Sequence, residues 1–156
     1  MTRLENLSRA IRPWTLTALR VVVGVVMAAH GWAKLTDYGS WLSNLDAMGM
    51  PYPEIAAPLA VTAELVGGVA LAIGALTPVA AGGVLSTMLV AIFLLHLPNG
   101  LFAKDGGFEY PLVMAAAALF FMTRGAGRFS VDSAILRWRR PQDDMTPVRR
   151  PTEATA

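Results

Sequence analysis

Long apolar runs dominate the chain and predict helices that cross a membrane. No formal charge occurs from Leu65 to Ala103, a run of 39 residues. As one helix it would be about 58 Å long, nearly twice the ~30 Å hydrocarbon core of a bilayer. The run must therefore fold back, and Thr77-Pro78 is the natural break because proline is tolerated at a helix start. With the flanking apolar runs, the predicted spans are residues 14–35, 55–76, 78–97 and 108–123.

Amphipathic segments outside the spans predict short helices at the membrane surface. Apolar side chains recur at helical spacing from Trp41 to Met48, and Gly49 can cap the end of that helix. Segment 126–140 carries arginines on one side and Ser130 as a candidate N-cap. Its other side gathers Val131, Ala134, Ile135 and Trp138. This second helix is expected to lie on the inner leaflet.

The predicted fold is thus an all-α, four-helix transmembrane bundle with short interfacial helices. Residues 1–13 form a basic cytoplasmic segment, 14–125 the bundle, 126–140 the interfacial helix and 141–156 a disordered tail. The apolar run of the last span, Tyr110 to Thr123, covers only about 21 Å as a helix. Either the Gly-rich loop before it dips into the outer leaflet, or the bilayer thins around it.

The number and placement of charged residues predict how the chain is oriented in the membrane and which molecules surround it. Charged residues make up 15% of the chain, against roughly 25% in a soluble domain. Eleven basic residues lie before the first span, at its start or after the last span, and two lie at the other face. Both termini should therefore be cytoplasmic. The positive charge suits anionic lipid, and no aromatic and basic platform for nucleic acid is present. Arginine supplies 11 of the 13 basic residues, which favours a GC-rich bacterial genome.

Ionisable residues inside the spans are costly and mark a candidate site. Arg20, His30 and Lys34 share one side of the first span, and Glu64 is the deepest charge of the second. Glu64 and His30 differ in depth by only about 6 Å. A pair between Glu64 and either His30 or Lys34 is therefore predicted, whereas Arg20 could reach Glu64 only from below.

Six polar residues gather in the outer half of the predicted bundle: His30, Lys34, Glu64, His96, Asn99 and Glu109. One interpretation is an ion-pair network that fixes helix register. A second is a site for a quinone or another small polar molecule, with Glu64 exchanging a proton. A third is a metal site of His and Glu side chains, although their spacing matches no metal motif. Without cysteine, a disulfide, a thiolate metal site and thiol chemistry are excluded.

The motifs together resemble the DoxX family of small four-helix membrane proteins. The matching pieces span roughly residues 15–125 and are Arg20, HGWAK (30–34), GMPYP (49–53), AELVGGVALAIGALT (63–77) and NGLFAKDGGFEYP (99–111). The resemblance implies a membrane subunit that associates with soluble redox enzymes, as in a thiosulfate:quinone oxidoreductase or beside sulfurtransferase and superoxide dismutase partners. It places the family's polar positions at Arg20, His30, Lys34, Glu64 and Glu109.

These lines lead to three functional hypotheses for a protein of the bacterial inner membrane. The first is a membrane subunit or anchor of an oxidoreductase complex. Its quinone pocket would use Glu64 for proton exchange, with Arg20, His30, Lys34, Asn99 and Glu109 around it. The second is a non-catalytic scaffold whose buried charges only fix helix packing. The third is a small-solute permeation protein, which would need an oligomer to form a pore. Any sulfur chemistry would belong to a partner or a bound cofactor.

Overall fold

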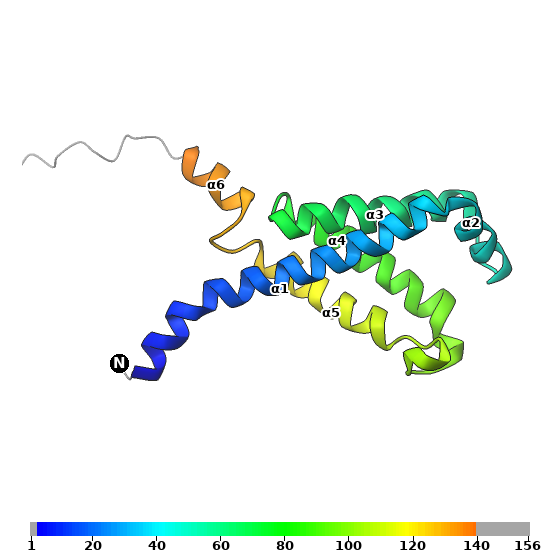
Figure 1. Ribbon diagram of the computed structural model, residues 1–156, viewed down its shortest axis with the longest axis horizontal. Helices are drawn as coiled ribbons and strands as arrows, with labels where there is room; N and C mark the ends of the chain where they lie inside the picture. The colour runs from blue at the N-terminus through cyan, green and yellow to red at the C-terminus, as the bar shows by residue number, and fades with distance from the viewer. Residues whose placement is uncertain (1–2, 140–156) are drawn as a thin grey trace, which may run out of the picture.

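The computed structural model describes residues 3–139, and every regular element in that range is a helix (Figure 1). The main helices are α1 (Arg3–Thr36), α3 (Pro53–Ile73), α4 (Thr77–Val90) and α5 (Glu109–Arg124). α1 packs along α3, α3 along α4, and α4 along α5. The predicted all-helical class is therefore confirmed. The predicted disordered tail, residues 141–156, lies outside the described residues.

Short helices occur where amphipathic segments predict them. α2 (Tyr38–Ala47) follows α1, and Gly49 behind it has a φ of +75°. α6 (Val131–Trp138) begins at Ser130, whose hydroxyl accepts a hydrogen bond from the Ser133 N–H at 3.1 Å. Both segments thus form a helix, the second beginning at the predicted Ser130 cap and shorter than the predicted 126–140. Their place at the membrane surface stays a prediction. We call the two ends of the bundle the α2 end and the α6 end.

α4 continues into irregular helix at the α2 end. A π-helical segment, η1 (Ala91–His96), and a 3₁₀ turn, η2 (Leu97–Asn99), extend it. A further 3₁₀ turn, η3 (Ala103–Asp105), lies in the loop before α5. π-Helical turns are rare and often occur at functional sites.

Three described helical stretches are long and apolar enough to cross a membrane: Glu5–Thr36, Pro53–Ile73 and Thr77–Asn99. They cover the first and third predicted spans and all but the last three residues of the second, because α3 ends at Ile73. α5 has 16 residues and is about 24 Å long, which is shorter than the hydrocarbon core. The fourth span, residues 108–123, stays a prediction, as does the orientation of the termini.

The predicted break at Thr77-Pro78 is confirmed. α3 ends at Gly74, which has a φ of +71°, and Pro78 lies in the first turn of α4. A left-handed residue at the end of a helix is best supplied by glycine. The resulting tight turn lets α3 and α4 lie antiparallel.

Glycines bring the backbones of α1 and α3 into direct contact. A Cβ on Gly31 would overlap the backbone of Leu65, and one on Gly24 would overlap that of Ala72. A Cβ on Gly68 would meet the Ala28 backbone in turn. Small residues allow such close approach in membrane helices. Around this contact the buried core gathers Val23, Met27, Leu71, Val84, Met88, Ile92 and Phe121.

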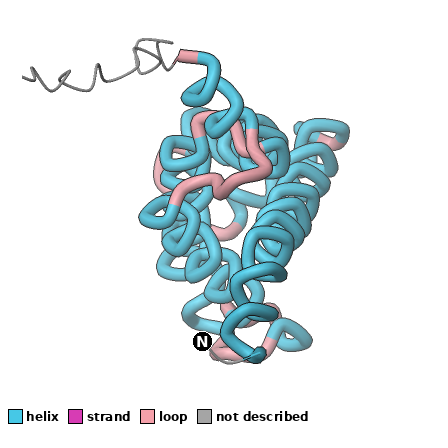
Figure 2. Tube along the Cα trace, turned by 90° about the vertical axis from the view of Figure 1, so that its left-hand side faces the viewer, coloured by secondary structure: helices cyan, strands magenta, loops and turns pink. Residues whose placement is uncertain are grey.

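Charged side chains fasten the C-terminal segment to the α6 end. The buried Arg20 donates to the carbonyls of Ala126 and, at 2.8 Å, of Phe129. The Asp132 carboxylate accepts the backbone N–H groups of Leu76 at 2.7 Å and Thr77 at 3.0 Å. Figure 2 looks onto this end and shows the loop before α6 crossing the bundle. α6 is therefore held against the α3–α4 turn.

Adding one methyl group at Gly31 should loosen the α1–α3 contact. Gly31→Ala should lower the free energy of unfolding by about 1–3 kcal/mol through overpacking. Gly39→Ala is the matched control, because Gly39 lies in α2 with nothing within 4 Å of the added Cβ. It should stabilise the protein by up to about 1 kcal/mol. Denaturant titration in detergent measures both, and equal stability of Gly31→Ala and the parent protein would refute the contact.

Asp132 should make stability depend on pH at low pH. Burial raises its pKa, but hydrogen bonds from Thr77 and Leu76 and the charge of Arg20 outweigh this, so its pKa lies below the ordinary 3.8. The ionised carboxylate therefore stabilises the fold above pH 3.8, and this contribution is lost as pH falls through the lowered pKa. Asp132→Asn removes the charge and one of the two accepting oxygens and should cost about 1 kcal/mol at pH 7. Unfolding at several pH values should show that difference vanish in acid; a constant difference would contradict it.

Candidate functional site

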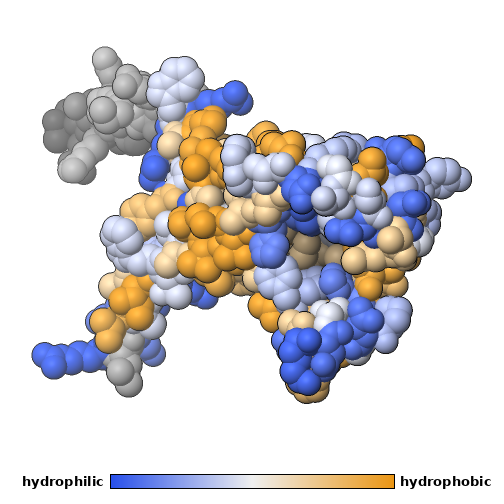
Figure 3. Space-filling model, turned by 45° about the vertical axis from the view of Figure 1, so that its right-hand side comes forward, coloured by the Kyte–Doolittle hydropathy of each residue, from blue (hydrophilic) through white to orange (hydrophobic). Residues whose placement is uncertain are grey.

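A cavity of about 310 Å³ opens at the α2 end of the bundle. Figure 3 shows the surface hollowed between α2 and the loop that carries η2 and η3. Most of its wall is apolar and rich in methionine. The polar side chains in its lining are His30, Lys34, Trp41, Glu64, Thr87, His96 and Tyr110. An apolar chamber with a few converging polar groups is typical of a ligand site.

An ion pair between Lys34 and Glu64 lies in the wall of the cavity. Lys34 is in the last turn of α1, and Glu64 lies in the middle of α3. The Glu64 side chain is 1% exposed and that of Lys34 is 21% exposed. The buried carboxylate is therefore paired with a partly exposed ammonium group. Of the two cations predicted to reach Glu64, the structure pairs Lys34 with it.

The pair satisfies only half of the carboxylate. Lys34 binds Oε1 of Glu64, whereas the buried Oε2 has no hydrogen-bond partner among the described residues. A buried charged oxygen without a partner is costly. Glu64, which lines the cavity, therefore has one acceptor oxygen that no described residue uses.

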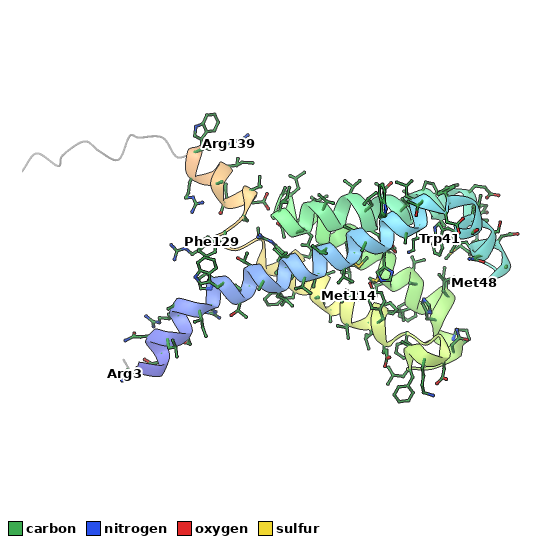
Figure 4. All side chains as sticks on the ribbon, in the orientation of Figure 1. Arg3, Trp41, Met48, Met114, Phe129 and Arg139 are labelled. Carbon is green, nitrogen blue, oxygen red and sulfur yellow. The ribbon has the colours of Figure 1, made fainter. Side chains whose placement is uncertain are left out.

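Trp41 brings a free donor to the same cavity. The Lys34 ammonium lies 4.3 Å from the centroid of the Trp41 ring, and such a cation–π contact holds both side chains. The indole Nε1 is buried and has no hydrogen-bond partner among the described residues. Figure 4 labels Trp41 on α2 and Met48 directly after the end of that helix. Helical spacing predicts an interfacial Trp41, and its place in a cavity wall escaped that prediction.

His30 faces α5 instead of Glu64. Its ring stacks on that of Tyr110, with centroids 4.9 Å apart. The Tyr110 hydroxyl donates to the Met27 sulfur at 3.9 Å. All three residues line the cavity. Sequence reasoning missed Tyr110 because nothing in the local pattern indicates which residue of α1 it meets.

The remaining predicted polar residues build the loop at the mouth of the cavity. His96 Nδ1 lies 2.7 Å from the Gly106 carbonyl, which also accepts a 3.2 Å hydrogen bond from Asn99. Glu109 accepts the Ala103 N–H at 2.9 Å. Of these predicted residues only His96 lines the cavity. Asn99 and Glu109 are therefore positioned to hold the loop and not to contact a ligand directly.

The structure places Arg20 apart from this cluster. Arg20 lies about 21 Å along α1 from Lys34, at the α6 end described above. The metal interpretation also lacks a geometric basis in residues 3–139, where no three His, Asp or Glu side chains are placed to hold an ion. The compact cluster is therefore Lys34, Glu64 and Trp41, with His30 and Tyr110 across the cavity.

Comparisons with known proteins agree with the sequence motifs. A family model described as DoxX matches residues 15–97. An uncharacterized protein of Haemophilus influenzae is 30% identical over 138 residues, covering 86% of this chain and 99% of that protein. The inner membrane protein YqjF of Escherichia coli is 27% identical over 113 residues, covering 72% and 85%. No solved structure matches.

Breaking the ion pair from the Lys34 side should be costly. Lys34→Met leaves the buried Glu64 carboxylate without its counter-charge, so the free energy of unfolding should fall by about 3–5 kcal/mol. Adding Glu64→Gln to that variant removes the stranded charge and should recover most of the loss. Denaturant titration of the two single variants and the double variant in detergent forms the cycle. Simply additive losses would show that the two side chains are not coupled.

Proposed function

Because the chain belongs to the DoxX family of membrane proteins, we propose that it is the membrane subunit of a redox system and binds a quinone in the cavity. The relative named inner membrane protein YqjF and the apolar helices support a location in a bacterial inner membrane. With three long apolar helices established by length and composition, the short α5 completes the bundle as a fourth span in this proposal.

The observation that carries the proposal is that two residues lining one cavity each have an unpaired polar atom, Oε2 of Glu64 and Nε1 of Trp41. A ligand that fits both must offer a donor and an acceptor on a small, largely apolar body. A quinol offers hydroxyl donors, and the oxidised quinone offers carbonyl acceptors. The cavity, about 310 Å³ in volume, has room for such a ring.

Each cavity residue has a role that follows from its contacts. Glu64 receives a proton at Oε2 and releases it, while Lys34 binds Oε1 and holds the carboxylate in place. Trp41 donates from Nε1 and orients the head group. Met27, Leu45 and Met88 line the chamber and exclude water from the proton-exchanging oxygen. A bound quinone would supply the carrier for two electrons and two protons.

Electrons must come from outside the chain in this proposal. The sequence has no cysteine, so a thiol of this subunit cannot supply them. We propose a soluble redox enzyme at the membrane as the donor, in line with the family resemblance.

A scaffold is the second candidate, favoured by one observation. Lys34 and Glu64 join α1 to α3, and such a pair can serve only to fix helix register. In that case the two unpaired polar atoms would have no ligand to meet. Quinone binding separates the two candidates.

Glu64→Gln should weaken binding of the reduced quinone. A hydrogen bond to a charged group is worth about 1.5–3 kcal/mol, so loss of the carboxylate should raise Kd for a decyl-tailed benzoquinol by tenfold or more. The oxidised form should be less affected, because it binds through its carbonyls. Quenching of Trp41 fluorescence measures Kd, in a protein whose other tryptophans, Trp14, Trp32 and Trp138, are replaced by Phe.

Glu109→Gln is the matched control for this experiment. It makes the same chemical change in a residue that bonds to the loop and lies outside the cavity lining. It should bind the quinol as the parent protein does. Equal Kd values for Glu64→Gln, Glu109→Gln and the parent would exclude Glu64 as the acceptor and favour the scaffold.

A further inference from the structure

Taking the proposed quinone-class site as given, we infer that its ligand is a long-tailed amphiphile dissolved in the membrane, and that it enters sideways between α1 and α5. This names both the route and the substrate class. A water-soluble ligand would instead have to come through the loop side of the cavity. The argument depends on how the helices close around the chamber.

The ring of helices is weakly closed between α1 and α5. α1 packs along α3, and α5 packs along α4, but α1 and α5 meet at few positions. Figures 1 and 4 show the two helices diverging toward the α2 end, where the cavity lies. We call this gap the α1–α5 seam, bounded by His30 and Met27 on α1 and by Tyr110 on α5.

Two side-chain contacts bridge the seam. The His30 ring stacks on the Tyr110 ring at 4.9 Å, and the Tyr110 hydroxyl reaches the Met27 sulfur at 3.9 Å. Ring stacking and a hydrogen bond to sulfur are both weak contacts. His30 lines the cavity and is itself exposed. The stacked rings of His30 and Tyr110 therefore close the seam directly beside the cavity.

The outer rim of the seam is apolar. Ala33 follows His30 by three residues on α1, and Val113 follows Tyr110 by three on α5; both are exposed. Residues three apart lie on the same side of a helix. The surface beside the seam thus suits acyl chains, whereas the charged pair, Lys34 and Glu64, lies at the cavity wall.

The cavity fits a head group and leaves a tail outside. Its volume of about 310 Å³ accommodates a substituted ring but not a long chain as well. A head group that enters through the seam passes His30 and Tyr110 into the chamber that Glu64 and Trp41 line, and its chain then stays among the lipids. Rotation of His30 and Tyr110 away from each other would open this path.

Cross-linking the seam tests the inference. Since the sequence has no cysteine, His30→Cys with Tyr110→Cys gives a unique pair, which a short bis-methanethiosulfonate can join. The protein carries Trp41 as its only tryptophan and is placed in phosphatidylcholine vesicles with brominated acyl chains. Cross-linking should at least halve the quenching of Trp41 by these chains. It should also slow uptake of a long-tailed quinone at least tenfold, and a reductant that cleaves the link should reverse both.

The matched control joins two helices that are already packed. Gly82→Cys with Met122→Cys links α4 to α5, where a Cβ at Gly82 would lie 3.7 Å from the Met122 sulfur. This link should change neither quenching nor uptake. Unchanged quenching and uptake in the seam-linked protein would overturn the inference.

The brominated-lipid arm keeps the seam and the quinone separable. If the seam link reduces quenching but no variant binds quinone, the proposed quinone function fails and lateral access stands. Should the double-cysteine protein not fold, His30→Ala provides the test in its place. Removing the stacked ring should increase quenching of Trp41 by brominated chains, and unchanged quenching would overturn lateral access.

Discussion

The close approach of α1 to α3 determines where the polar groups of the cavity lie. Gly24 and Gly31 on one helix and Gly68 on the other leave no room for a Cβ between the backbones. At that separation Lys34 reaches Glu64 from the next helix. A wider spacing would leave a carboxylate stranded in an apolar bundle, which is far costlier than the pair. Close packing of these glycines is thus what lets the Glu64 carboxylate be buried next to its Lys34 partner.

The half-satisfied state of Glu64 says more about function than the ion pair itself. A pair that only fixed register would gain by satisfying both carboxylate oxygens, since each unpaired buried polar atom costs stability. Here Oε2 of Glu64 and Nε1 of Trp41 are both left unpaired, and both residues line one chamber. Unsatisfied groups that converge on a cavity are characteristic of binding sites. This geometry therefore supports the proposed ligand site over the scaffold.

Local pattern in the sequence was enough to predict the break at Thr77-Pro78 and short helices at α2 and α6. It also predicted a partner for Glu64, but left His30 and Lys34 both open, and the structure pairs Lys34 with it. Each follows from helical period, capping chemistry or depth along a span. The positions of Trp41, Asn99 and Glu109 could not be predicted from the sequence, because they depend on how a loop folds back onto the bundle. Period assigns a residue to one side of its own helix, but not to the neighbour it meets. Sequence reasoning is limited in the same way for α5. Its apolar length alone does not decide whether this helix crosses the membrane.

The two ends of the molecule are closed by contacts of different strength. At the α6 end, Arg20 and Asp132 hold the chain through charge-assisted hydrogen bonds to backbone groups, which are among the stronger ones. At the α2 end, His30 and Tyr110 close the bundle through a ring stack. α4 joins the two, with its start capped by Asp132 and its continuation π-helical beside the cavity. The cavity therefore lies at the end of the bundle that the weaker contacts close.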